Sequence, residues 1–162
     1  MLRCSVTEKL VDGFHVYGAS ASAKFEIVAN RGGVFVLAVD IAGRVPSRDT
    51  FDWESKISIQ VTDREMPQFM CAVLGITPTF DFRNHGSKKN KSLSLANQPE
   101  KGILYLRVTE GQVGHSIPIS ADKVFHLGVI GMKVLSRQTG ADTQTCLLLL
   151  RGTTGRLLHG LQ

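Results

Sequence analysis

The sequence predicts an α+β fold of two units, each a meander of β-strands followed by a helix (ββββα twice). Three observations predict it: apolar and polar residues alternate in several short segments, turn-forming residues separate these segments, and two apolar helical segments follow them. Short turns imply antiparallel pairing, and helices that follow such meanders pack on one face of the sheets. The two units repeat roughly 60 residues apart, as a repeat of architecture only.

The first unit is expected to follow an N-terminal arm. Residues 1–22 are mixed in character, and we expect them to form a poorly fixed arm, of which 1–15 lie outside the folded domain. Strands are predicted over 23–29, over the apolar and therefore buried run 34–41, and over 56–61, where isoleucine and valine alternate with polar residues. The first unit thus supplies strands of opposite character, one nearly all apolar and one with a polar face.

A helix is expected directly after these strands. Thr62 and Glu65 have the spacing of a capping box, and the apolar segment behind them runs to Leu74 before Gly75. Pro67 removes a backbone donor from this segment. Either the first turn is distorted, or the helix begins with Pro67 at its first position.

The second unit repeats this order. Its helix is expected to begin at Ser120, a capping residue with Asp122 in the first turn, and to run to about Gln138 before Gly140. The strands predicted before it are 79–83, 91–96, 103–109 and 115–119.

The chain after the second helix is expected to be a tail. The two units together form one domain over 16–140, and 141–162 is the C-terminal tail. The apolar run 146–150 is too short to span a membrane and could be a packed strand or a helix turn. Residues 152–162 are expected to be frayed.

Charge is concentrated in one segment. The formal net charge is +5. The span from Arg83 to Arg107 contains six Lys or Arg and one acid, Glu100, so it carries the whole excess. A basic excess on strand-like sequence favours a polyanionic partner, whereas the alternative is a solvated loop without a partner.

Several classes of protein are not favoured. No apolar run is long enough for a membrane helix, and the N-terminus lacks the apolar core of a secretory signal. We therefore expect no membrane partner and a cytoplasmic location, nucleoid-associated in a bacterium, with an organelle matrix as the alternative. Three widely spaced cysteines and scattered histidines predict neither a metal nor another cofactor, and no catalytic motif is present. We expect a protein that is not an enzyme.

Binding residues are expected on the faces of strands. In the strand 103–109, Tyr105 and Arg107 share the face opposite the leucines, and an exposed ring beside a guanidinium is a platform for an unpaired base and its phosphate. The alternative is that Tyr105 pairs across strands and Arg107 meets Glu100 or Glu110.

Further candidates extend this platform. Phe51 and Trp53 are expected at the rim of the same sheet, or else as cover for the edge of the core. Hydrogen bonds and charge are expected from another strand, through Lys56, Ser58 and Gln60. Mobile electrostatic attraction of phosphates is expected from the basic loop, through Lys88, Lys89 and Lys91. The nucleic-acid-binding candidates are Lys24, Phe51, Trp53, Lys56, Ser58, Gln60, Arg83, Lys88, Lys89, Lys91, Tyr105 and Arg107.

The second helical segment is apolar almost all round until Lys133, so one sheet cannot cover it. Gly128 and Gly131 lower helix stability and are expected to permit a close backbone approach. The sequence predicts a helix-mediated oligomer.

Short motifs resemble the Whirly family of single-stranded DNA-binding proteins and their structural relatives, the mitochondrial guide-RNA-binding proteins. The aromatic-Asp-Trp signature is present as Phe51-Asp52-Trp53, followed by an alternating strand that ends at Val61-Thr62. Ile117-Pro118-Ile119-Ser120 is similar to the family's Pro-Val-Thr before the second helix, and 33–48 is similar in pattern. The resemblance covers roughly residues 16–138.

This resemblance implies a homotetramer with helices at its centre. Single-stranded nucleic acid would lie across the sheets, held by aromatic stacking and by contacts with basic side chains. By position it implicates Lys24, Trp53, Lys56, Tyr105 and Arg107. The plant members' Lys-Gly-Lys-Ala-Ala-Leu run is replaced by Ala21-Ser22-Ala23-Lys24-Phe25-Glu26, which favours a bacterial or mobile-element origin.

The function expected from these observations is single-stranded DNA binding with little sequence preference, in replication, repair, recombination or transcription. The alternatives are RNA binding, as in the guide-RNA-binding proteins, and a non-catalytic subunit that docks an acidic partner through the basic loop.

Overall fold

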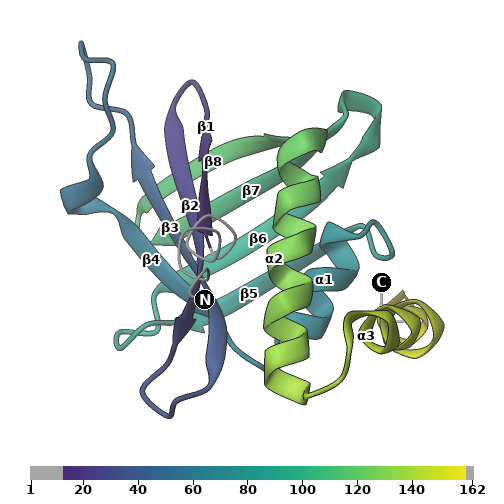
Figure 1. The fold of residues 1–162 in the computed structure, drawn as a ribbon. Coiled ribbons are helices and arrows are strands. Elements are labelled where there is room, and N and C mark those ends of the chain that lie inside the picture. The colour runs from purple at the N-terminus through teal and green to yellow at the C-terminus, as the bar shows by residue number, and fades with distance from the viewer. Residues whose placement is uncertain (1–12, 160–162) are drawn as a thin grey trace, which may run out of the picture.

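The computed structural model describes residues 13–159 and contains two four-stranded antiparallel sheets with helices packed on them (Figure 1). The first sheet has the order β1-β2-β3-β4 and the second the order β5-β6-β7-β8. The α+β class and the two repeated units are therefore confirmed. The strands are β1 Gly13–Tyr17, β2 Ala21–Ala29, β3 Phe35–Gly43, β4 Ile57–Val61, β5 Thr79–His85, β6 Lys91–Gln98, β7 Ile103–Glu110 and β8 Val113–Ser120.

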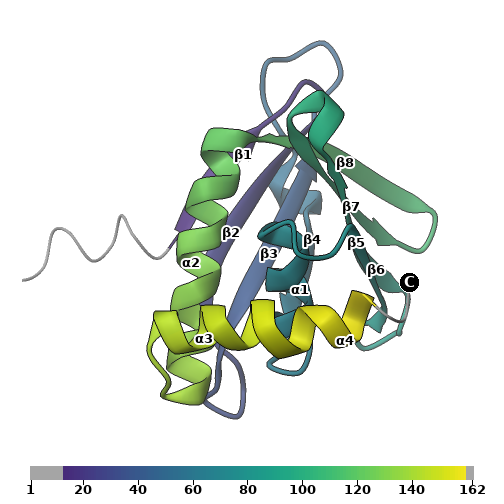
Figure 2. The ribbon, with the colours of Figure 1, turned by 90° about the vertical axis from the view of Figure 1, so that its right-hand side faces the viewer.

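A helix follows each sheet, and further helical turns follow the second unit. The helix that follows each sheet lies against the inner faces of the sheets, and the later helical turns pack on these two helices (Figures 1 and 2). The helical elements are η1 Trp53–Ser55, α1 Met66–Val73, η2 Pro99–Lys101, α2 Ala121–Thr139, α3 Thr143–Leu149, the π-helical η3 Leu150–Thr154 and α4 Gly155–His159.

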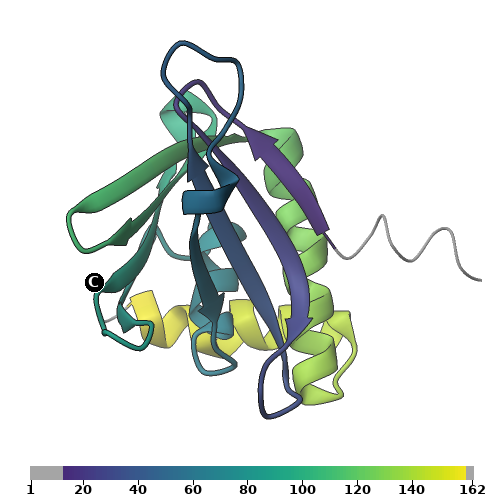
Figure 3. The same cartoon turned by 90° about the vertical axis from the view of Figure 1, so that its left-hand side faces the viewer.

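One apolar core joins the two units. The inward faces of both sheets contribute to it together with α1 and α2, and Phe69 of α1 packs on Phe80 of β5 with ring centroids 5.2 Å apart. Because helices cover the inner faces, the opposite face of each sheet is turned outward (Figure 3). These two outer faces carry the candidate binding residues.

Strand β1 corrects the prediction of a poorly fixed arm that leads directly to a strand at residue 23. It crosses the boundary expected at residue 15, and it pairs with β2 from Gly13↔Glu26 to Tyr17↔Ser22. Tertiary contacts stabilise this short edge strand: Val16 is buried, and Phe14 stacks on Phe25 with centroids 5.3 Å apart. Residues 1–12, the rest of the expected arm, lie outside the described residues.

The tail is also more ordered than expected. The run 146–150 belongs to a helix rather than a strand, and the prediction of fraying from residue 152 is wrong as far as His159. Asp142 caps α3 by accepting a hydrogen bond from the Thr145 backbone N–H at 2.7 Å, and this bond lowers the pKa of Asp142. Gly155 is buried, and a Cβ there would lie 2.2 Å from Cγ2 of Ile76. Residues 160–162 are outside the described part.

The capping box at α1 is present, although the regular helix begins later. The Thr62 N–H donates to Glu65 Oε2 at 3.0 Å, and the Glu65 N–H donates to Thr62 Oγ1 at 3.3 Å. The α-helix itself starts at Met66, with Pro67 in its first turn. The distorted first turn, not a start at Pro67, is how the chain accommodates the proline.

At α2 the predicted cap takes another form. Ser120 occupies the N-cap position, but it makes no capping bond to the backbone. Its hydroxyl donates to the Asp122 carboxylate instead, and this bond lowers the pKa of Asp122. The helix ends as expected at Gly140, which has a φ of 72°.

Replacing Thr62 with alanine should lower the free energy of unfolding by about 1 kcal/mol, because one half of the capping box is lost. Urea unfolding followed by circular dichroism measures this change. Thr153→Ala is the matched control, because Thr153 is exposed in η3, and its effect should stay within about 0.5 kcal/mol. Equal stability of Thr62→Ala and the wild type would contradict a stabilising role for the box.

Candidate functional site

Tyr105 and Arg107 lie on the outer face of the second sheet, at the centre of strand β7. Across the sheet, Tyr105 is flanked by Ala96 and Pro118, whose small side chains leave the tyrosine ring 38 % exposed. Leu104 and Leu106 point into the core, as the alternation predicted. A rigid sheet therefore presents the ring to solvent.

Arg107 is oriented on this face without a described carboxylate partner. Its guanidinium donates to Ser116 Oγ on β8 at 3.3 Å. Glu110, one of the two acids considered as a partner, instead accepts from Lys91 at 3.2 Å. The alternative in which Arg107 is neutralised by Glu100 or Glu110 is thus not seen in residues 13–159, and the charge of Arg107 remains available to an anion.

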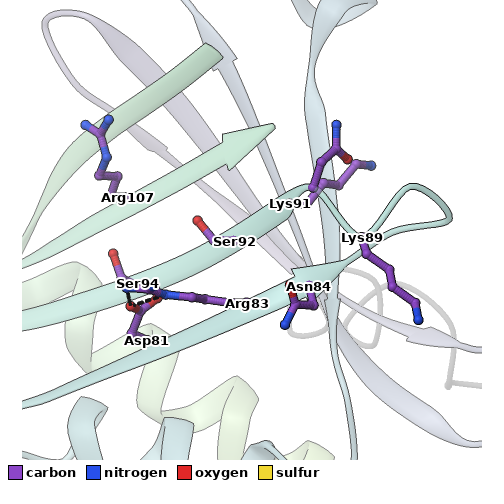
Figure 4. A pocket seen from close by; sticks show the side chains of 9 residues that line it. Asp81, Arg83, Asn84, Lys89, Lys91, Ser92, Ser94 and Arg107 are labelled. Carbon is purple, nitrogen blue, oxygen red and sulfur yellow. Dashed lines mark hydrogen bonds and ion pairs between the residues drawn. The ribbon is translucent and has the colours of Figure 1, made fainter. Parts of the chain in front are cut away.

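A shallow hollow of about 410 Å³ adjoins Arg107 (Figure 4). Four cationic side chains line it, against a single carboxylate, that of Asp81. Asp81 pairs with Arg83 at 2.7 Å, and this bond raises the pKa of the already basic Arg83. The hollow keeps a positive excess and is suited to phosphate. Its lining residues are Asp81, Arg83, Asn84, Lys89, Asn90, Lys91, Ser92, Ser94 and Arg107.

The basic loop divides into two parts. Lys88 and Lys89 are exposed between β5 and β6, as expected for groups that attract phosphate. Lys91 was expected to be mobile with them, and this expectation is wrong. It is the first residue of β6, and it donates to the Ser58 backbone carbonyl of β4 at 3.1 Å in addition to pairing with Glu110. Lys91 therefore links the second sheet to the first.

The outer face of the first sheet has balanced charge. Lys24 pairs with Glu26 at 2.9 Å, and Lys56 pairs with Asp40 at 2.7 Å. Ser58 and Gln60 of β4 are exposed on this face, as the alternation predicted. Their polar groups lie on a different sheet from Tyr105, so the predicted residues form two faces and not one.

Four aromatic side chains, which we call the ring cluster, gather on the first sheet: His15, Tyr17, Phe51 and Trp53. His15 stacks on Tyr17 with centroids 5.8 Å apart and meets Trp53 edge-on at 5.6 Å, while Tyr17 lies 6.2 Å from Phe51. Phe51 and Trp53 were expected at the rim of the Tyr105 sheet, and this is wrong. The connection from β3 to β4 folds them towards β1.

Sequence reasoning missed His15 and Tyr17. Both lie in the stretch treated as an arm, although the alternation of Phe14, His15, Val16 and Tyr17 is a strand signal. Tyr17 is 68 % exposed, more than any other aromatic residue described on a strand. The ring cluster is therefore a second surface on which a base could stack.

Other chemistry finds little support among residues 13–159. No group of three or more metal-ligating side chains occurs there. Burial raises the pKa of the Cys71 thiol, which disfavours the thiolate that a nucleophile needs. Within the same range, no helix is long and apolar enough to cross a membrane.

Comparison with known proteins gives a likeness of fold. No family model matches the chain, and no curated protein matches it. The crystal structures of MRP1/MRP2 from Trypanosoma bruciei are similar with a TM-score of 0.58 at 11 % identity, over 79 % of this chain and 86 % of that one. A guide-RNA-binding protein complex bound to a guide RNA is similar with a TM-score of 0.58 at 10 % identity, over 83 % of this chain and 97 % of that one.

Proposed function

We propose that this protein binds single-stranded nucleic acid without catalysing a reaction, and that RNA is the ligand to test first. The observation that carries the proposal is the outer face of the second sheet, where the exposed Tyr105 ring adjoins Arg107 and a hollow with four cations and one carboxylate. A ring for the base beside cations for the phosphates is the arrangement that single strands require.

RNA comes before DNA because one similar structure is a protein complex bound to a guide RNA. The sequence resemblance to the Whirly family favours single-stranded DNA, and we propose a distant relationship to both groups. The 2′-hydroxyl distinguishes the two ligands through local contacts. A direct competition between matched strands therefore decides between them.

The test is fluorescence anisotropy with labelled oligouridine and oligothymidine of about 12 nucleotides, and a duplex of equal length. We expect both single strands to bind more tightly than the duplex, with RNA ahead of DNA. If the four cations of the hollow contact phosphates, log K should fall against log salt with a slope of about −2 to −3. Absence of binding at low salt would refute the proposal.

Trp53 provides an internal probe, because it is the only tryptophan in the chain. If the bound strand reaches the ring cluster, oligouridine should quench the Trp53 emission in parallel with the anisotropy change. Phe125 is an aromatic residue on the helix side, so Phe125→Leu should leave the quenching intact. Binding with an unchanged Trp53 spectrum would show that the bound strand does not reach the ring cluster.

We also propose that copies of the chain assemble through their helices as a homotetramer. A hollow of about 710 Å³ lies between α2 and α3, and it is bordered by the exposed apolar side chains of Leu74, Phe125 and Val129. Contiguous apolar surface of this kind is typical of an interaction site. We call this surface the helix face.

The two glycines of α2 have different surroundings. At Gly131 a Cβ would lie 2.2 Å from the sulfur of Met70, so this glycine lets α1 approach α2, as predicted. At Gly128 a Cβ would meet nothing within 4 Å. Gly128 therefore leaves a notch in the helix face, and a helix of another copy could approach it closely.

A further inference from the structure

We propose that the outer face of the first sheet contains a guanine-reading site, in the hollow between β2 and the β5–β6 hairpin. This inference rests on the proposed function and adds a base preference to it. The hollow measures about 730 Å³ and is bounded by residues of both sheets. Its lining is mixed in character, unlike the cationic hollow beside Arg107.

The floor of this site is Ala38. The register places Ala38 of β3 between Glu26 of β2 and Gln60 of β4, and all three belong to the outer face. Adjacent strands are about 4.8 Å apart, so Glu26 and Gln60 stand on strands separated by about 10 Å. The Ala38 methyl group between the longer side chains of Glu26 and Gln60 leaves a flat surface about as wide as a nucleobase.

One wall of the site supplies acceptors. Glu26 pairs with Lys24 through Oε2, and Asp40 accepts a hydrogen bond from Lys56 at Oδ2. Within residues 13–159, the second oxygen of each carboxylate makes no hydrogen bond or ion pair. An ionised carboxylate only accepts, and it can receive two parallel hydrogen bonds. The Watson–Crick edge of guanine offers N1–H and the N2 amino group side by side, which fits this wall.

The opposite wall supplies donors. The Gln60 amide carries two N–H donors, and the Lys91 ammonium, held by Ser58 and Glu110, retains a third N–H. The Hoogsteen edge of guanine presents two acceptors, N7 and O6. Adenine has an acceptor at N1 facing the carboxylates, and uracil lacks the Hoogsteen nitrogen. Guanine is the base that matches both walls.

Basic side chains near the site are placed to contact the phosphates of a nucleic-acid strand that continues onto the second sheet. Arg31, exposed in the turn between β2 and β3, lines the same hollow. Lys91 lines both this hollow and the cationic one beside Arg107. A nucleic-acid strand could thus pass from the cationic hollow to the guanine site by way of Lys91.

The experiment compares labelled oligouridines in which isolated guanines replace some uracils, oligouridines in which isolated adenines replace the same uracils, and uracil alone, so that none of the oligomers pairs with itself along its length. A bidentate base contact discriminates by about 1–3 kcal/mol, so the guanine oligomer should bind the wild type about tenfold more tightly than the adenine oligomer. Glu26→Gln keeps the shape but replaces one acceptor by a donor. It should reduce this preference to less than about twofold and leave oligouridine affinity nearly unchanged.

Asp49→Asn is the matched control, because Asp49 is a carboxylate that pairs with Arg44 outside the hollow. It should retain the guanine preference. Equal binding of the guanine and adenine oligomers, or a preference that survives in Glu26→Gln, would overturn the guanine site while binding of oligouridine still supports the proposed function. Failure of all three oligomers to bind would overturn both.

Discussion

Replacing Tyr105 and Arg107 together with alanine should lower the affinity for oligouridine about 100-fold. Base stacking on an aromatic side chain contributes about 1–3 kcal/mol to binding, which the variant loses. Removal of the Arg107 charge also removes a phosphate contact. Because 1.4 kcal/mol corresponds to a tenfold change, a combined loss near 3 kcal/mol gives this factor. Both side chains are exposed, so the fold should be retained.

Two further variants separate the contribution of Tyr105 and Arg107 from that of other cations. Arg151→Ala removes an exposed cation from η3, distant in the sequence from the second sheet, and should change the affinity by less than about twofold. Lys88→Ala with Lys89→Ala should reduce the salt slope by about 1.4 and weaken binding less than the Tyr105 and Arg107 variant does. If the Lys88 and Lys89 variant abolishes binding and the Tyr105 and Arg107 variant has no effect, docking of an acidic partner through the basic loop is favoured instead.

Introducing glutamate at both Phe125 and Val129 should convert the assembly to monomers. Phe125 is 69 % exposed and Val129 40 % exposed in the isolated chain, so the charges cost little in a monomer. In a helix-mediated assembly they would be buried without partners, which costs several kcal/mol for each ion. Light scattering after size exclusion measures the change directly.

Leu157→Glu is the matched control for this variant. It places the same charge on an exposed apolar position of α4, outside the helix face, and the assembly should persist. A wild-type protein that is strictly monomeric would contradict the proposed homotetramer. Nucleic-acid binding by the outer faces could still be tested in that case, because those faces lie away from the helices.

The parts of the fold that sequence reasoning predicted are those with a strong local signal. Strand β4 is correct because Ile57, Ile59 and Val61 alternate with polar residues, and the structure buries those three. The capping box at Thr62 was found because its bonds join residues only three apart. Local periodicity and capping determine such elements without knowledge of their neighbours.

The missed elements depend on contacts between distant residues. Strand β1 is five residues long and is held by Phe25 and the β2 backbone. The helical turns from 150 to 159 include two threonines and two glycines, which have low helix propensity, and burial of Leu150 and Gly155 against the rest of the fold stabilises them. In both cases tertiary packing determines the local structure.

The candidate site was predicted in its residue types but not in its grouping. The alternation correctly placed Tyr105 and Arg107 on one outer face, because residues two apart in a strand share a face. Phe51 and Trp53 lie on the first sheet because the long connection that contains them folds towards His15 and Tyr17. Pairing between strands, which a single sequence does not reveal, separates the two faces.

The most direct test of the central claim is photocrosslinking of an oligouridine that contains 4-thiouridine, with the modified peptides identified by mass spectrometry. A single strand that lies across the outer faces should crosslink to Tyr105 on β7 and to neighbouring residues of β5 and β6. Excess unlabelled oligouridine should compete the adducts away. Crosslinks confined to α2 and α3, with none on the second sheet, would contradict the account.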